Sequence, residues 1–73
     1  MTDSERAEEH RRAAEHHRKI AEVYRELGDS AMRRSIKNAY YRIADGHTRL
    51  AALEDEAAFA AQASYRRLID LNR

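Results

Sequence analysis

The stretch that decides the fold runs from Ser30 to Leu71 and reads SAMRRSIKNAYYRIADGHTRLAALEDEAAFAAQASYRRLIDL. Apolar or small residues recur along it in alternating steps of four and three residues, and no proline interrupts the run. Such spacing keeps one stripe of side chains on one side of an α-helix, so the sequence predicts a long amphipathic helix. The stripe consists of Met32, Ile36, Ala39, Ile43, Gly46, Leu50, Leu53, Ala57, Ala60 and Ser64, and it continues after a shift of one residue as Leu68 and Leu71.

Gly46 leaves two interpretations of this stretch open. Either Asp45 and Gly46 form a turn and Thr48 caps a third helix, or the helix runs through Gly46 at a cost of about 1 kcal/mol relative to alanine. The stripe keeps its register on both sides of Gly46, and Ala51 stands three residues after Thr48 where a capping box would have an acidic residue. We therefore predict a continuous helix, and a three-helix bundle broken near Gly46 is the alternative.

The N-terminal part of the chain predicts a second helix that ends at a glycine. Thr2 and Glu5 have the spacing of a capping box, and a seam of apolar residues and histidines runs from there to Leu27. Gly28 follows directly, at the position where a left-handed glycine commonly ends a helix. A short connection makes two neighbouring helices antiparallel. The expected fold is an all-α antiparallel hairpin in one domain, residues 1–73, with helices over about 3–27 and 30–71 and a turn at 28–29.

Composition bounds the class of protein. The chain has 73 residues, no cysteine and no proline, and its 14 basic and 13 acidic residues give a net charge of +1. Alanine, arginine and glutamate favour helices, while the near-balanced charge argues against a dedicated nucleic-acid or membrane-surface protein. No apolar run is long enough to span a membrane, and the acidic N-terminus does not resemble a signal peptide. We expect a cytoplasmic protein that is not an enzyme, uses no cofactor and does not contact membranes.

The predicted helices differ in length, which suggests self-association. Folded back at residues 28–29, the first helix would cover the second only as far as about Leu53. The rest of the second helix carries apolar side chains that a stable monomer rarely exposes. We therefore expect a homodimer or homotetramer that forms a helical bundle. The residues expected to anchor the hairpin are Ile36, Ile43, Leu50 and Leu53, and those expected between subunits are Ala57, Ala61, Tyr65, Leu68 and Leu71.

Histidines are the candidate metal ligands. Chelation from one helix needs ligands three or four residues apart, and no histidine of this chain has a second histidine or a carboxylate at that spacing. We therefore assign no metal site within one helix. A site formed between helices or subunits would use His10, His17 and His47. These seam residues would also make assembly depend on pH.

A basic cluster with a neighbouring tyrosine is the candidate nucleic-acid contact. Basic residues interleaved with aromatic rings hold phosphates and stack bases, whereas the alternative interpretation is a solvated helix face. The cluster consists of Arg33, Arg34, Lys37, Tyr41 and Arg42. No serine has a histidine base at a recognisable spacing, and no catalytic residue is predicted.

From Ala13 to Glu54 the chain resembles a loose class of short bacterial helical-hairpin proteins of uncharacterised function. The resemblance lies in Ile20-Ala21, Tyr24-Arg25-Glu26-Leu27, the following Gly-Asp pair, Ile43-Ala44 and Leu50-Ala51. It implies a hairpin whose second helix runs through the position of Gly46. The expected function is a small protein–protein interaction module, such as a scaffold, adaptor or inhibitor, that acts as a homo-oligomer and binds another protein. Weak association with nucleic acid and a metal site of histidines between subunits are the alternatives.

Overall fold

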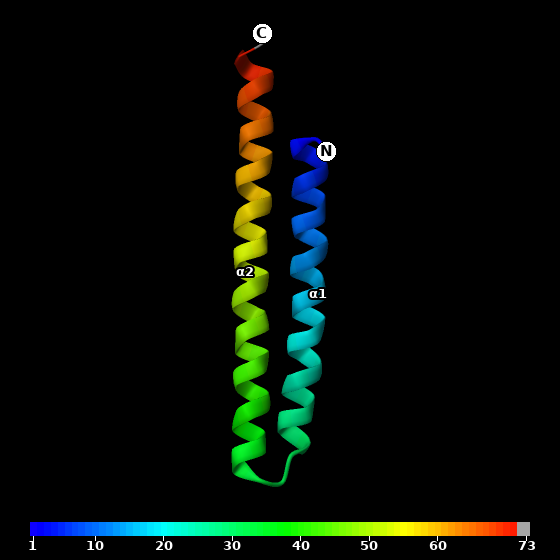
Figure 1. Cartoon of the computed structure of the whole chain (residues 1–73), viewed down its shortest axis with the longest axis vertical. Helices are drawn as coiled ribbons and strands as arrows, with labels where there is room; N and C mark the ends of the chain where they lie inside the picture. The colour runs from blue at the N-terminus through cyan, green and yellow to red at the C-terminus, as the bar shows by residue number, and fades with distance from the viewer. Residues whose placement is uncertain (72–73) are drawn as a thin grey trace.

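Two helices lie side by side in the computed structural model, which describes residues 1–71 except for the side chains of Tyr65 and Leu68. Helix α1 (Asp3–Ser30) and helix α2 (Arg34–Leu71) are antiparallel and form a rod of 61 × 14 × 13 Å (Figure 1). The predicted all-α hairpin with a long second helix is confirmed. Because α2 is continuous through Gly46, the alternative of a three-helix bundle is wrong.

The cap of α1 agrees with the sequence pattern. The Thr2 hydroxyl oxygen accepts a hydrogen bond of 3.1 Å from the Glu5 backbone N–H, which satisfies one of the free donors of the first turn. Asp3 and Glu5 lie in that turn, where their negative charge suits the positive end of the helix dipole. Helix α1 therefore begins where the capping box predicts.

The turn lies three residues later than predicted. Gly28 is inside α1, Ala31 is the C-cap residue with its N–H donating to the Gly28 carbonyl, and the connection occupies residues 31–33. The reason is the ring of Tyr41, which packs against the bare Cα of Gly28: a Cβ added there would lie 2.6 Å from Tyr41 Cε1. Gly28 therefore admits an aromatic ring rather than ending the helix, and the predicted boundaries at 27, 28–29 and 30 are wrong.

This displacement changes which residues face each other. His10 contacts Glu54, His17 contacts His47 and Tyr24 contacts Tyr40, and in each pair the two residue numbers add to 64. A turn at 28–29 would have opposed residues 27 and 30, whose numbers add to 57. Helix α1 therefore reaches about seven residues further along α2, and Ser4 and Ala7 lie beside Arg66 and Ile69. The prediction that α1 covers α2 only to Leu53 is wrong.

The contact between the helices is made of small residues. Among the described residues, every buried side chain belongs to alanine, and these alanines recur every seventh residue, as in a coiled coil. Small side chains at the contact allow two helix axes to approach closely. The buried positions are Ala7, Ala14, Ala21 and Gly28 on α1, and Ala44, Ala51 and Ala58 on α2.

The predicted hairpin anchors lie beside this core rather than in it. Ile36, Ile43 and Leu50 are 43%, 41% and 44% exposed, and Leu53 is more exposed still. Ile43 and Leu50 each precede a buried alanine by one residue, so the prediction chose the neighbouring stripe of α2. A Cβ at Gly46 would meet no atom within 4 Å, so Gly46 lies on an open part of the α2 surface and makes no contact with α1.

Candidate functional site

The buried alanines divide the hairpin into two faces. Successive residues of a helix are about 100° apart, so the residues three and four positions after each buried alanine lie on opposite sides of the alanine line. We define the histidine face by a central row made of His10, His17 and Tyr24 of α1 with Tyr40, His47 and Glu54 of α2. We define the arginine face by Arg11, Arg18 and Arg25 of α1 with Thr48, Asp55 and Gln62 of α2.

The arginine face is a ladder of polar contacts with a seven-residue spacing on both helices. Nη2 of Arg11 donates to Gln62 Oε1 at 2.7 Å, Nη2 of Arg25 donates to Thr48 Oγ1 at 2.7 Å, and Arg18 pairs with Asp55 between them. Each contact is solvent-exposed, so each contributes no more than about 1 kcal/mol to stability. The ladder sets the register of the two helices, and each of the three arginine side chains has a partner on α2.

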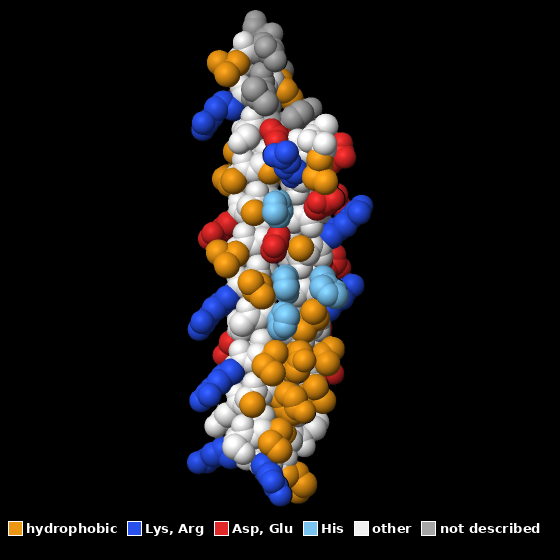
Figure 2. Space-filling view, viewed as in Figure 1, with side chains coloured by type: hydrophobic (Ala, Val, Ile, Leu, Met, Phe, Trp, Pro, Cys, Tyr) orange, Lys and Arg blue, Asp and Glu red, His pale blue; other side chains and the backbone are white. Residues whose placement is uncertain are grey.

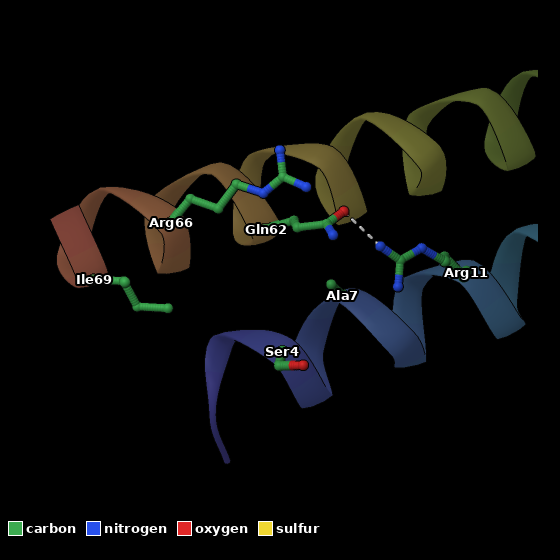
Figure 3. A pocket seen from close by; sticks show the side chains of 6 residues that line it. All are labelled: Ser4, Ala7, Arg11, Gln62, Arg66 and Ile69. Atoms are coloured by element: carbon green, nitrogen blue, oxygen red, sulfur yellow. Dashed lines mark hydrogen bonds between the residues drawn. The ribbon is translucent and has the colours of Figure 1, made fainter.

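A pocket of about 280 Å³ opens at the end of the hairpin away from the connection (Figure 3). It is lined by Ser4, Ala7, Arg11, Gln62, Arg66 and Ile69. Its hydroxyl group, that of Ser4, has no histidine or carboxylate among the lining residues to act as a base. We therefore assign no chemistry to this pocket.

Aromatic rings and one carboxylate occupy the centre of the histidine face. Nδ1 of His17 and Nδ1 of His47 are 2.9 Å apart, so one ring donates and the other accepts. The Tyr24 ring lies nearly parallel to the His47 ring, at 6.2 Å between centroids, and also contacts Tyr40 at 5.9 Å. Nδ1 of His10 donates to Glu54 Oε2 at 2.6 Å. The centre of this face is therefore an ordered polar row between two helices.

Apolar side chains flank that row on both helices. They recur every seventh residue, and pairs such as Ile20 with Ile43 and Leu27 with Ile36 lie level with each other because their numbers add to 63. Figure 2 looks onto this face and shows the hydrophobic groups gathered mainly towards the connection, with the histidines along the middle. We call these side chains the outer rows: Ala13, Ile20 and Leu27 on α1, and Ile36, Ile43, Leu50 and Ala57 on α2.

The structure separates the residues predicted to lie between subunits. Ala57 belongs to an outer row of the histidine face. Ala61 lies seven residues after Glu54 and so on the central row towards α1, and Leu71 is 78% exposed at the end of α2. The side chains of Tyr65 and Leu68 lie outside the described residues.

The predicted nucleic-acid cluster is not a single surface with a free aromatic ring. Tyr41 packs on Gly28 and its hydroxyl donates to Asp29 Oδ1. This hydrogen bond, with smaller contributions from desolvation and from the Asp29 charge, raises the pKa of Tyr41 above its ordinary value. Lys37 is half-buried on the line of the core alanines. Only Arg33, Arg34 and Arg42 remain as exposed members of the cluster.

Of the three candidate metal ligands, the structure brings His17 and His47 together and places His10 one level away against Glu54. Within residues 1–71, no three histidine, aspartate or glutamate side chains are grouped so that they would hold a metal ion. A metal site of this hairpin alone would therefore have two protein ligands.

Comparisons with protein-family models, with curated proteins and with solved structures found no match to this chain. Neither described helix has a stretch that is apolar and long enough to cross a membrane. The two faces of the hairpin and the residues on them are the basis for assigning a function.

Proposed function

We propose that this chain is a small helical protein–protein interaction module that acts as a homodimer through its histidine face and catalyses no reaction. One observation carries the proposal: among the described residues the buried side chains are alanines, while five large aliphatic side chains lie exposed or half-buried on the histidine face, namely Ile20, Leu27, Ile36, Ile43 and Leu50. In a domain that folds alone, the large apolar side chains usually occupy the core. Here they are left for a partner.

The hairpin gains little free energy from its own packing. Burying a complete leucine or isoleucine side chain contributes roughly 1.5–3 kcal/mol, and an alanine contributes about a third of that because it has a single methyl group. Two-helix chains of this length have a thin core and are commonly stabilised by oligomerisation. Covering Ile20, Leu27, Ile36, Ile43 and Leu50 would supply the apolar burial that the alanine contact does not.

The shape of the histidine face favours a second copy as its occupant. The hairpin is 61 Å long and 13–14 Å across, which projects to roughly 800 Å² per copy, the area that one partner contributes to a standard stable interface. A second hairpin matches this length, and its own outer rows supply leucine and isoleucine at the same seven-residue spacing. Two such faces in contact form a four-helix bundle. The arginine faces would then point outwards and remain available to another protein, as expected for a scaffold or adaptor.

Two matched substitutions test the proposal. Ile43→Ser removes a large side chain from an outer row, and Phe59→Ser removes an exposed one that lies away from this face. We expect the wild-type chain and Phe59→Ser to have the mass of a dimer in light scattering, and Ile43→Ser to have the mass of a monomer with helical circular dichroism retained at low temperature. A wild-type monomer at all accessible concentrations, or a dimer that Ile43→Ser leaves intact, would contradict the proposal.

Weak nucleic-acid binding is the second candidate, and the exposed arginines near the connection support it. Within the part of the chain that the structure describes, no carboxylate lies within ion-pair distance of Arg33, Arg34 or Arg42. Contacts of this kind to phosphates weaken steeply with salt. Binding to a single-stranded oligonucleotide that falls between low and physiological salt, and falls further in Arg34→Gln, would favour this alternative.

A further inference from the structure

We propose that a dimer formed through the histidine face contains a binding site for a divalent transition-metal ion such as Zn²⁺, with His17 and His47 of both copies as its four ligands. The inference rests on the proposed homodimer. It assigns a chemical role to the pair of histidine rings that spans both helices on this face.

The two histidine donor atoms lie close to the separation of two ligands on one ion. With metal–nitrogen bonds of about 2.0–2.1 Å, two ligand nitrogens are about 2.9 Å apart at a right angle and about 3.3 Å apart at the tetrahedral angle. Nδ1 of His17 and Nδ1 of His47 are 2.9 Å apart. An ion bound at the tetrahedral angle would widen this separation by about 0.4 Å and would need the two rings to turn until both lone pairs point at it. Imidazole is a preferred ligand of Zn²⁺, Cu²⁺ and Ni²⁺.

The histidine pair lies halfway along the part of the rod in which both helices are side by side. Helix α1 spans Asp3–Ser30, so its midpoint lies between His16 and His17, and the facing residue of α2 is His47. Identical patches meet in a two-fold dimer. If the two-fold axis runs along the rod, each residue of the face lies opposite the same residue of the other copy. If the axis crosses the rod, the parts in which both helices lie side by side overlap most when the midpoints of α1 coincide. Both arrangements place the His17–His47 pair of one copy against that of the other.

The histidine pair is surrounded by an aromatic ring and aliphatic side chains. The Tyr24 ring lies nearly parallel to the His47 ring, at 6.2 Å between centroids. Ile20, Ile43 and Leu50 flank the pair, so a second copy would exclude water from it. The nearest charged contact on the same face joins His10 and Glu54, seven residues along each helix from the pair, and it is made within the hairpin.

The experiment titrates Zn²⁺ alone into the full chain near neutral pH, in a buffer that does not bind zinc, with calorimetry as the readout. The variants are His17→Asn and His47→Asn, because an asparagine amide can keep the hydrogen bond to the remaining histidine but is a poor zinc ligand. The matched control is His16→Asn, which changes a neighbouring exposed histidine whose ring centroid is 6.2 Å from that of His17. The mass of every protein is measured in the presence of chelator and again with zinc.

We expect one Zn²⁺ per two chains, affinity at least about tenfold lower in His17→Asn and in His47→Asn, and unchanged affinity in His16→Asn. No zinc binding by a wild-type chain that is a dimer in chelator would remove the metal site and leave the interaction module standing. A wild-type monomer with and without zinc would overturn both proposals. One ion per chain, or an equal loss of affinity in all three variants, would overturn the shared four-histidine site.

Discussion

Replacing each of the two glycines by alanine should have opposite effects on stability. Gly46 lies inside α2, and a Cβ added there would meet no atom within 4 Å. Alanine is favoured over glycine by about 1 kcal/mol in an exposed helix interior, because glycine loses more backbone entropy when it becomes helical. We expect Gly46→Ala to raise the free energy of unfolding by about that amount. For a domain of this size the melting temperature would rise by about 4–8 °C.

Gly28 is also helical, but the Tyr41 ring occupies the space that a Cβ would need. A Cβ there would lie 2.6 Å from Cε1 and 2.8 Å from Cδ1 of Tyr41, closer than carbon atoms approach in proteins. The ring would have to move, and its hydroxyl would lose the hydrogen bond to Asp29. Forcing an extra methyl group into a packed site costs about 1–3 kcal/mol, which exceeds the gain in helix propensity. We expect Gly28→Ala to lower the free energy of unfolding by about 1 kcal/mol.

The assay is urea and thermal unfolding followed by circular dichroism, with all variants at one protein concentration. Tyr41→Ala supplies the control, because without the ring Gly28→Ala should become stabilising, as Gly46→Ala is in the wild type. If Gly28→Ala stabilised the wild-type chain as much as Gly46→Ala does, Tyr41 would not pack on Gly28 and the explanation of the late turn would be wrong. A loss of stability in Gly46→Ala would mean that other atoms occupy the space beside Gly46.

Two further predictions concern the alanine contact and Tyr41. Ala14→Leu should lower the free energy of unfolding by about 1–3 kcal/mol because a larger side chain separates the helices, whereas Ala13→Leu, on an outer row, should not; urea unfolding compares the two. Since the Asp29 hydrogen bond raises the pKa of Tyr41 above the unfolded value of 10.0, it stabilises the fold fully below that pH and is lost as the pH rises through the higher folded pKa. In a spectrophotometric titration, Tyr41→Phe should therefore remove a group that ionises above the ordinary tyrosine value, and a high-pH part of the curve that the substitution leaves unchanged would contradict this.

The helices themselves were predictable from local sequence. Three local signals predicted them: the absence of proline, the unbroken three-four spacing across Gly46 and the capping pattern at Thr2. The structure confirms the start of α1 and the continuity of α2 that these signals predict. The turn was not predictable in this way. The ring that packs on Gly28 belongs to Tyr41, which lies on the other helix, so no neighbouring residue signals that this glycine stays helical. An error of three residues in the turn then shifted the facing residues by seven.

Periodicity alone does not identify which stripe of α2 faces α1. Ile43 and Leu50 recur every seventh residue, and so do Ala44 and Ala51, so spacing alone favours neither stripe. Side-chain size distinguishes them, because a single partner helix at close approach has room only for small residues, whereas leucine and isoleucine fill the wider interior of a four-helix bundle. Alanine at every seventh position on both helices was therefore the available signal for the hairpin contact. Ile43, Leu50 and the other residues predicted as the core of one chain are therefore of a size that suits the core of an assembly.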